Sequence, residues 1–234
     1  MYEWKDVLII GDSFAGHRVD PKTDWPSILT QRLTGNTFLR DPRGKGFVGS
    51  AWWSVRTHLL KQLKESIPKV LILVHTEPMR LPSDNDLALN IVSVSHKEFF
   101  HSHYRHRHVD DNLRIAADLY YKYLQSTAFH LWAQEQWYKE LDEILDKHQI
   151  PKVVHFHAFL PWNPENTVYT FRNGITFDTP LWEISDDVKL SNEKKAFGTD
   201  HRNHFSIQNN IILANVVYDA LNSYSDGLRK LTLD

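Results

Sequence analysis

One serine, one aspartate and one histidine of this chain stand where they could together hydrolyse an ester. Ser13 closely follows the apolar run Val7–Ile10, and Asp200 and His204 stand together just before a predicted C-terminal helix. A serine hydroxyl becomes a good nucleophile only when a base takes its proton, and histidine is the usual base near neutral pH. A carboxylate commonly orients that histidine. We therefore expect Ser13, His204 and Asp200 to form a catalytic triad.

The element that must position Ser13 is a short strand. Four consecutive apolar residues at Val7–Ile10 are typical of a strand that is buried on both faces. In open α/β sheets ligands bind outside the carboxyl ends of the strands, which is where Ser13 would lie. A second interpretation is that Gly11, Asp12 and Ser13 only end the strand and begin a turn, which these residue types often do.

An ester hydrolase also needs hydrogen-bond donors for the negative oxygen that develops during attack. The backbone N–H of Ser13 is one candidate. A glycine-rich loop over 41–49 offers others, because glycine allows the backbone to approach a ligand closely. Gly49 is the first choice, since it directly precedes a predicted helix and helix N-termini favour anions, and Gly46 is the second.

Strands and helices alternate along most of the chain, which predicts a parallel sheet in a three-layer α/β sandwich. The predicted sheet has about five strands, and 79–149 interrupts the alternation as a helical insertion in a single domain spanning 1–234. The expected elements are strands at 7–10, 37–40, 70–74 and 153–158, with helices that begin after Asp24, Ser50 and Ser206.

The insertion and the segment that follows it carry further expectations. Within 79–149 we expect one helix over 86–94 and two more, which begin at Asp110 and end near His148. The histidine-rich stretch 101–108 is predicted to be a solvated loop rather than a metal site, because its arginines would repel a cation. An Asn-Gly pair between 168–171 and 175–177 predicts a small hairpin.

Composition narrows the classes of function. The chain has 234 residues, a formal net charge of −2 and no cysteine, which gives no support to nucleic-acid binding and excludes disulfides and thiolate metal sites. The first residues lack a basic stretch followed by a long apolar one, so we expect no signal peptide and a cytoplasmic location. No apolar run approaches the ~18 residues of a membrane span. Neither a metal nor an organic cofactor is expected.

The stretch Gly11-Asp12-Ser13-Phe14 resembles the first sequence block of the SGNH, or GDSL-type, serine hydrolases. The helix from Trp25 to Gly35 is similar to the helix that follows this block, and Asp200 with His204-Phe205-Ser206 resembles the last block. The resemblance covers roughly 5–77 and 150–222. It implies a flavodoxin-like α/β enzyme that cleaves acyl esters, with Ser13 as the nucleophile and Gly49 or Gly46 as the glycine of the second block.

The chain departs from that family in two places. The third block ordinarily ends in an asparagine whose amide donates to the oxyanion, but here the sequence is His75-Thr76-Glu77-Pro78. An ionised glutamate cannot donate, so Thr76, His75 or Arg80 would have to supply the donor, and Glu77 is expected to pair with Arg80 or Arg56. The spacing from Asp200 to His204 is also one residue longer than usual. The residues expected to line the substrate site are Asp12, His75, Thr76, Glu77, Trp52 and Trp53.

The function expected from these features is a serine esterase that acts on a small-molecule or carbohydrate ester, with an O-acetyl group as the leading substrate. The departures resemble a divergent subgroup that is associated with tailed phages and environmental sequences, which adds a host cytoplasm or a virion as locations. The alternative is a non-catalytic binding or virion-associated protein on the same scaffold. The sequence leaves the oligomeric state open.

Overall fold

A computed structural model describes residues 1–15, 24–35, 51–83, 88–103, 110–159, 168–184, 205, 207–223 and 230–231. The chain folds as an α/β protein around a parallel sheet in the order β1-β2-β5-β6-β7, as the alternating pattern predicts. The pairing places Val7 of β1 beside Val70 of β2, and Val70 beside Lys152 of β5. The strands are β1 (Val7–Ile10), β2 (Val70–His75), β5 (Lys152–His157), β6 (Ile175–Phe177) and β7 (Lys230–Leu231). The strand expected at 37–40 lies outside the described residues.

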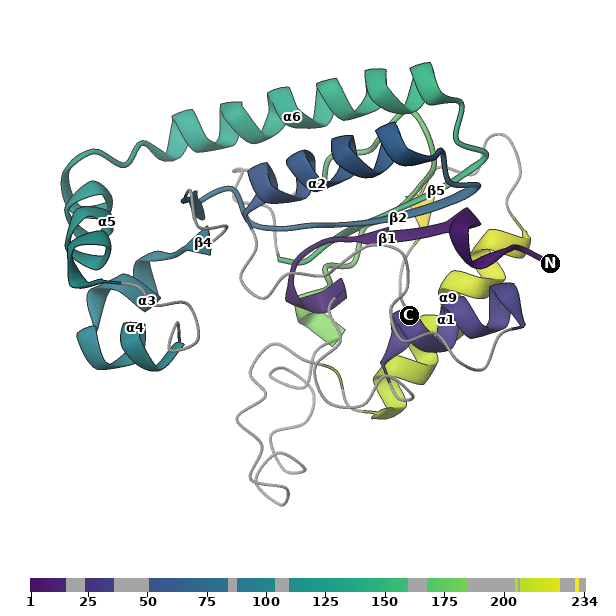
Figure 1. Ribbon diagram of the computed structural model, residues 1–234, viewed down its shortest axis with the longest axis horizontal. Coiled ribbons are helices and arrows are strands. Elements are labelled where there is room, and N and C mark those ends of the chain that lie inside the picture. Colours follow the sequence, from purple (N-terminus) through teal and green to yellow (C-terminus); the bar gives the residue numbers. More distant parts are fainter. Residues whose placement is uncertain are drawn as a thin grey trace.

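Two helical layers cover this sheet (Figure 1). On one face, α1 (Trp25–Thr34) and α9 (Ile207–Asn222) pack on the odd-numbered residues of β1 and the even-numbered residues of β2. On the other face, α2 (Trp52–Glu65) and α6 (Thr127–His148) cover the alternate residues. Each strand of the sheet core is buried on both sides, which explains its nearly continuous apolar sequence. The three-layer α/β/α expectation is confirmed.

Helix boundaries follow local signals in most cases. Asp24 caps α1 by accepting a hydrogen bond from Ser27 N at 3.0 Å, and Asp110 caps α5 (Asp111–Tyr123) through Leu113 N at 2.9 Å. The expectation that Ser50 caps α2 is wrong, because the cap position is Ala51, which has no side chain to accept a hydrogen bond. The last helix begins at Ile207, and its expected cap Ser206 lies outside the described residues.

The insertion 79–149 divides into two parts. Its last helix, α6, is a full member of the sheet-covering layer and leads directly into β5. The remainder forms a small cluster with its own apolar core around Phe100 and Tyr121, beyond the carboxyl ends of β1 and β2 (Figure 1). The elements of this cluster are β3 (Leu81–Pro82), β4 (Ala88–Leu89), α3 (Ile91–Ser95), α4 (Lys97–His103) and α5.

Three expectations about local structure are wrong. The helix predicted over 86–94 is replaced by β4, which pairs antiparallel with β3, and by the short α3. The loop predicted over 101–108 begins as the end of α4, and 104–109 lie outside the described residues. The hairpin at Asn173-Gly174 does not form, because Ile175–Phe177 joins the main sheet as β6, parallel to β5. Burial of all three β6 residues between the helical layers decides this pairing.

Replacing Gly174 by alanine is expected to destabilise the protein by about 3 kcal/mol. Gly174 has φ of +100°, and a Cβ there would stand 2.6 Å from the Val153 carbonyl oxygen, which belongs to a strand and cannot move away. Urea unfolding measures the change. The control is Gly35→Ala, where φ is +71° but the added Cβ meets only the flexible side chain of Met1, so about 1 kcal/mol is expected. Equal losses in the two variants would contradict the argument.

Candidate functional site

Ser13 begins a short 3₁₀ turn, η2 (Ser13–Ala15), at the carboxyl end of β1. The carboxylate of Asp12 accepts a hydrogen bond from Phe14 N at 3.0 Å, and its backbone carbonyl accepts one from Ala15 N at 3.0 Å. The Trp25 indole donates to the Phe14 carbonyl at 2.7 Å and ties the turn to α1. The turn is therefore held by Asp12 and Trp25, and Asp12 accepts hydrogen bonds from the amides of Phe14 and Ala15.

Asp12 is completely buried, and among the described residues no group donates a hydrogen bond to its Oδ2. Burial raises the pKa of the Asp12 carboxyl, while the Arg80 guanidinium, 3.8 Å away, and the Phe14 amide act against that rise. The Thr76 hydroxyl also favours the ionised form of Asp12. Among the described residues neither Asp12 Oδ2 nor Thr76 Oγ1 has a hydrogen-bond partner. Buried polar atoms without partners are rare in folded proteins and concentrate at functional sites.

Glu77 forms an ion pair with Arg80, one of the two partners expected for it. Arg80 Nε donates to Glu77 Oε1 at 2.8 Å, and the arginine side chain is only 6% exposed. The other expected partner, Arg56, instead donates to Glu140 with its Nε at 2.7 Å. The Arg80 charge thus lies between two carboxylates, those of Asp12 and Glu77, and offsets the negative charge that Glu77 brings to the end of β2.

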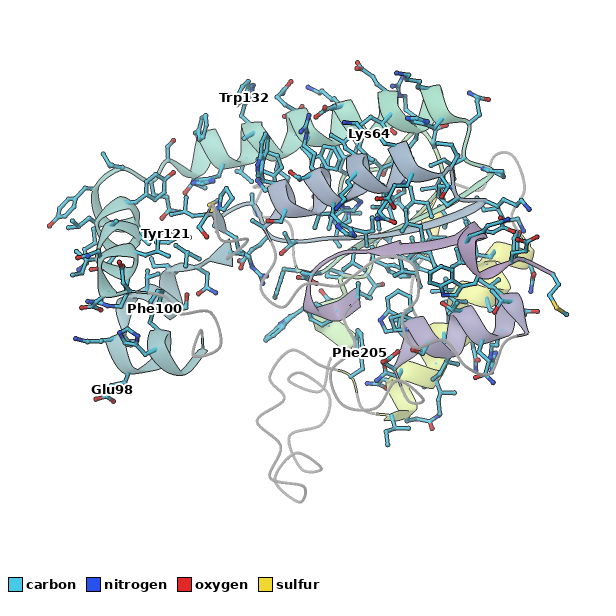
Figure 2. The ribbon with its side chains drawn as sticks, in the orientation of Figure 1. Lys64, Glu98, Phe100, Tyr121, Trp132 and Phe205 are labelled. Atoms are coloured by element: carbon cyan, nitrogen blue, oxygen red, sulfur yellow. The ribbon has the colours of Figure 1, made fainter. Side chains whose placement is uncertain are left out.

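Aromatic rings gather around the turn after β1. Phe14 packs against Phe159, which follows β5, and against Phe205, which precedes α9, with ring centroids 5.7 and 5.4 Å apart. Phe159 also contacts Trp182 of η3 (Leu181–Ile184) and lies 5.2 Å from the Arg80 guanidinium. Figure 2 shows Phe205 near this turn. Two segments separated by nearly the whole chain therefore meet at Phe14 and Phe205, which directly follow Ser13 and His204 in the sequence.

His75 lies on the opposite face of the sheet, under α6. Its Nε2 is 3.0 Å from His155 Nδ1, and its ring packs against Tyr138 and Phe171. His155 Nε2 faces the Asn173 carbonyl at 2.9 Å and must donate to it, so His155 Nδ1 accepts and His75 Nε2 donates. His75, one of the residues expected to line the substrate site, has its ring in an aromatic core shared with His155 and His157.

Burial keeps these three histidines uncharged at neutral pH. Desolvation lowers the pKa of His155 to about 3 and that of His157 to about 4, and it lowers the pKa of His75 well below its ordinary value. Sequence reasoning missed His155 and His157, although their alternation with the buried Phe156 was the available signal. Among the described residues no group of histidines and carboxylates is arranged to hold a metal ion.

Trp52 and Trp53 begin α2. Trp52 packs partly onto the core between the sheet and the helices α2 and α6. Trp53 is 47% exposed, and its ring lies 5.0 Å from the guanidinium of Arg56. The two indoles meet edge to face, with centroids 5.6 Å apart. Trp53 is therefore the more exposed of the two indoles.

The remaining residues expected at the site lie outside the residues that the structure describes. Asp200, His204, Gly46, Gly49 and the side chain of Ser13 belong to this group. In the part of the chain that the structure describes, no helix has both the length and the hydropathy to cross a membrane.

Comparison with known proteins gives no relative. No family model, no curated protein and no solved structure matches this chain. Function must therefore be argued from the residues and their geometry.

Proposed function

We propose that the protein is a serine esterase. Ser13 attacks the ester carbonyl, and His204 takes the serine proton and then passes it to the leaving alcohol. Asp200 orients His204, while the N–H groups of Ser13 and of Gly49 or Gly46 stabilise the oxyanion. Water, activated by the same histidine, then attacks the acyl-serine and releases the acid. The reaction needs neither a metal nor an organic cofactor.

The contact between Phe14 and Phe205 carries the proposal. These residues directly follow Ser13 and His204 in sequence, and their ring centroids lie 5.4 Å apart. The contact therefore joins the two segments that carry Ser13 and His204 in the sequence. A nucleophile and its base must come within hydrogen-bond reach, and an anchor of this kind favours that approach.

The ion pair at the end of β2 supports the same proposal. A free Glu77 carboxylate would oppose an oxyanion, but Arg80 compensates its charge at 2.8 Å. The unpartnered hydroxyl of Thr76 can donate a hydrogen bond, so Thr76 and Arg80 supply polar groups where the usual asparagine is missing. An O-acetyl ester of a carbohydrate is the substrate we propose, since the partly exposed rings of Phe159 and Trp182 give a small acyl group and a sugar ring apolar surface to contact.

A fluorophosphonate probe tests this proposal, because it reacts with activated serines. The folded protein is expected to gain one adduct, which peptide mass spectrometry assigns to Ser13. Protein denatured before exposure is the control and should remain unlabelled. An absence of adduct in the folded protein, or an adduct on another serine, would contradict the esterase and favour the non-catalytic binding protein.

A further inference from the structure

The segment between β2 and β3, Thr76–Arg80, is here called the site loop. Its main-chain carbonyls are held by side chains from the insertion. Gln134 of α6 donates from Nε2 to the Thr76 carbonyl at 2.7 Å, and Tyr121 of α5 donates to the Met79 carbonyl at 2.8 Å. His130 of α6 lies against the Pro78 carbonyl. Three carbonyls within four residues are thus contacted from outside the sheet.

The contacts of Tyr121 are buried, that of Gln134 is partly buried, and further hydrogen bonds support them. The Tyr121 hydroxyl also lies 2.6 Å from the Leu89 carbonyl, so its single proton is shared between the site loop and β4. The Tyr120 hydroxyl is 2.9 Å from His130 Nε2, which fixes the orientation of that imidazole. Figure 2 shows Tyr121 on α5, within the small cluster beyond the end of β2. Tyr121 and His130 are at most 7% exposed.

The site loop carries the polar groups that face the turn of Ser13. Thr76 and Arg80 both act on Asp12, the residue that builds this turn. Catalytic geometry is sensitive to displacement, since a shift of about 1 Å can cost about 100-fold in rate. Side chains that hold the loop backbone therefore also determine where its polar groups stand during the reaction.

We propose that Gln134 is a positioning residue for the esterase reaction and that the insertion serves to hold the site loop. The inference rests on the proposed function. The side chain of Gln134 donates its hydrogen bond to the main chain of Thr76, so it acts on the reaction through the loop and not on the substrate. Its loss should lower kcat and leave KM nearly unchanged, because loop geometry matters most when charge develops in the transition state.

Two substitutions separate this role from general stability. Gln134→Met keeps the length of the side chain but removes the donor, and kcat for p-nitrophenyl acetate is expected to fall about 10- to 100-fold, with KM within about 2-fold. Gln134→Glu replaces the donor by a carboxyl that donates only when protonated. The ratio of its kcat to that of the wild type should rise as pH is lowered from 8 to 5.5, whereas the ratio for Gln134→Met should stay flat.

Gln136→Glu, in the same helix, is the matched control and should behave like the wild type at every pH. Wild-type kcat in Gln134→Met would overturn this inference, and so would a pH-independent ratio in Gln134→Glu. Thermal unfolding of each variant confirms that the folded protein is being assayed. A wild-type protein without Ser13-dependent turnover would instead overturn the proposed function, and this inference with it.

Discussion

Replacement of Ser13 by alanine is expected to reduce kcat/KM for p-nitrophenyl acetate by a factor of about 1,000 or more. The substitution removes the attacking oxygen, so acyl transfer to the enzyme cannot occur. The turn itself should survive, because it is held by the backbone and carboxylate of Asp12 and by the Trp25 indole. Stopped-flow absorbance of released nitrophenol should show a burst in the wild type and none in Ser13→Ala.

The matched control for this experiment is Ser54→Ala. Ser54 lies in the first turn of α2, and its loss should leave kcat/KM within about 2-fold of the wild type. Equal, slow turnover by the wild type and by Ser13→Ala would show that hydrolysis does not proceed through this serine. In that case the alternative of a non-catalytic binding protein would be the better explanation of the fold.

Acidification is expected to destabilise the protein well before its carboxylates are protonated. His155 and His157 are buried as neutral rings, with pKa values lowered to about 3 and about 4 from the ordinary 6.5. In the unfolded chain these histidines therefore become protonated near pH 6.5, whereas in the folded protein they remain neutral at that pH. Stability is complete above that pH and is lost as pH falls, by about 1.4 kcal/mol per pH unit for each histidine, or about 2 kcal/mol each at pH 5.

Burial also lowers the pKa of His75 and His130, which therefore add to this loss, whereas the carboxylates do not. The hydrogen bond from Arg114 lowers the pKa of Asp111 below its usual 3.8, so the contribution of that carboxylate is lost only in stronger acid. Burial raises the pKa of Asp12, which favours the folded protein as pH falls and opposes the loss. A decline in stability between pH 6.5 and 5 therefore belongs to the buried histidines.

Urea unfolding at pH 7.5, 6 and 5 measures the loss of unfolding free energy. A variant shows how much of that loss comes from His157. His157→Gln keeps a donor near the Tyr169 carbonyl, which His157 Nε2 faces at 3.4 Å, but it cannot gain a proton. The difference in unfolding free energy between pH 7.5 and 5 should shrink by about 2 kcal/mol in this variant. His96 is exposed, so His96→Gln should retain the full wild-type difference. An unfolding free energy that is constant from pH 7.5 to 5 would refute the argument.

Structural features that depend only on residues close together in the sequence could be predicted from it. The apolar runs of β1 and β2 predicted strands buried on both faces, because neither face offers a polar residue to water. Asp24 and Asp110 predicted the starts of α1 and α5, since a cap satisfies amides within three residues of itself. The order of these elements predicted the three-layer sandwich. The triad, by contrast, stays a prediction.

Tertiary structure alone decided the contacts between distant segments. β6 pairs with β5 rather than in a hairpin, because the sheet buries all of its residues and a local hairpin would not. The protonation state of His155 is likewise decided by the layers that remove it from water. The bond from Gln134 to the Thr76 carbonyl spans 58 positions, and no local pattern distinguishes Gln134 from other polar residues of α6. Sequence periodicity determines which face of an element is buried, whereas packing determines what that face meets.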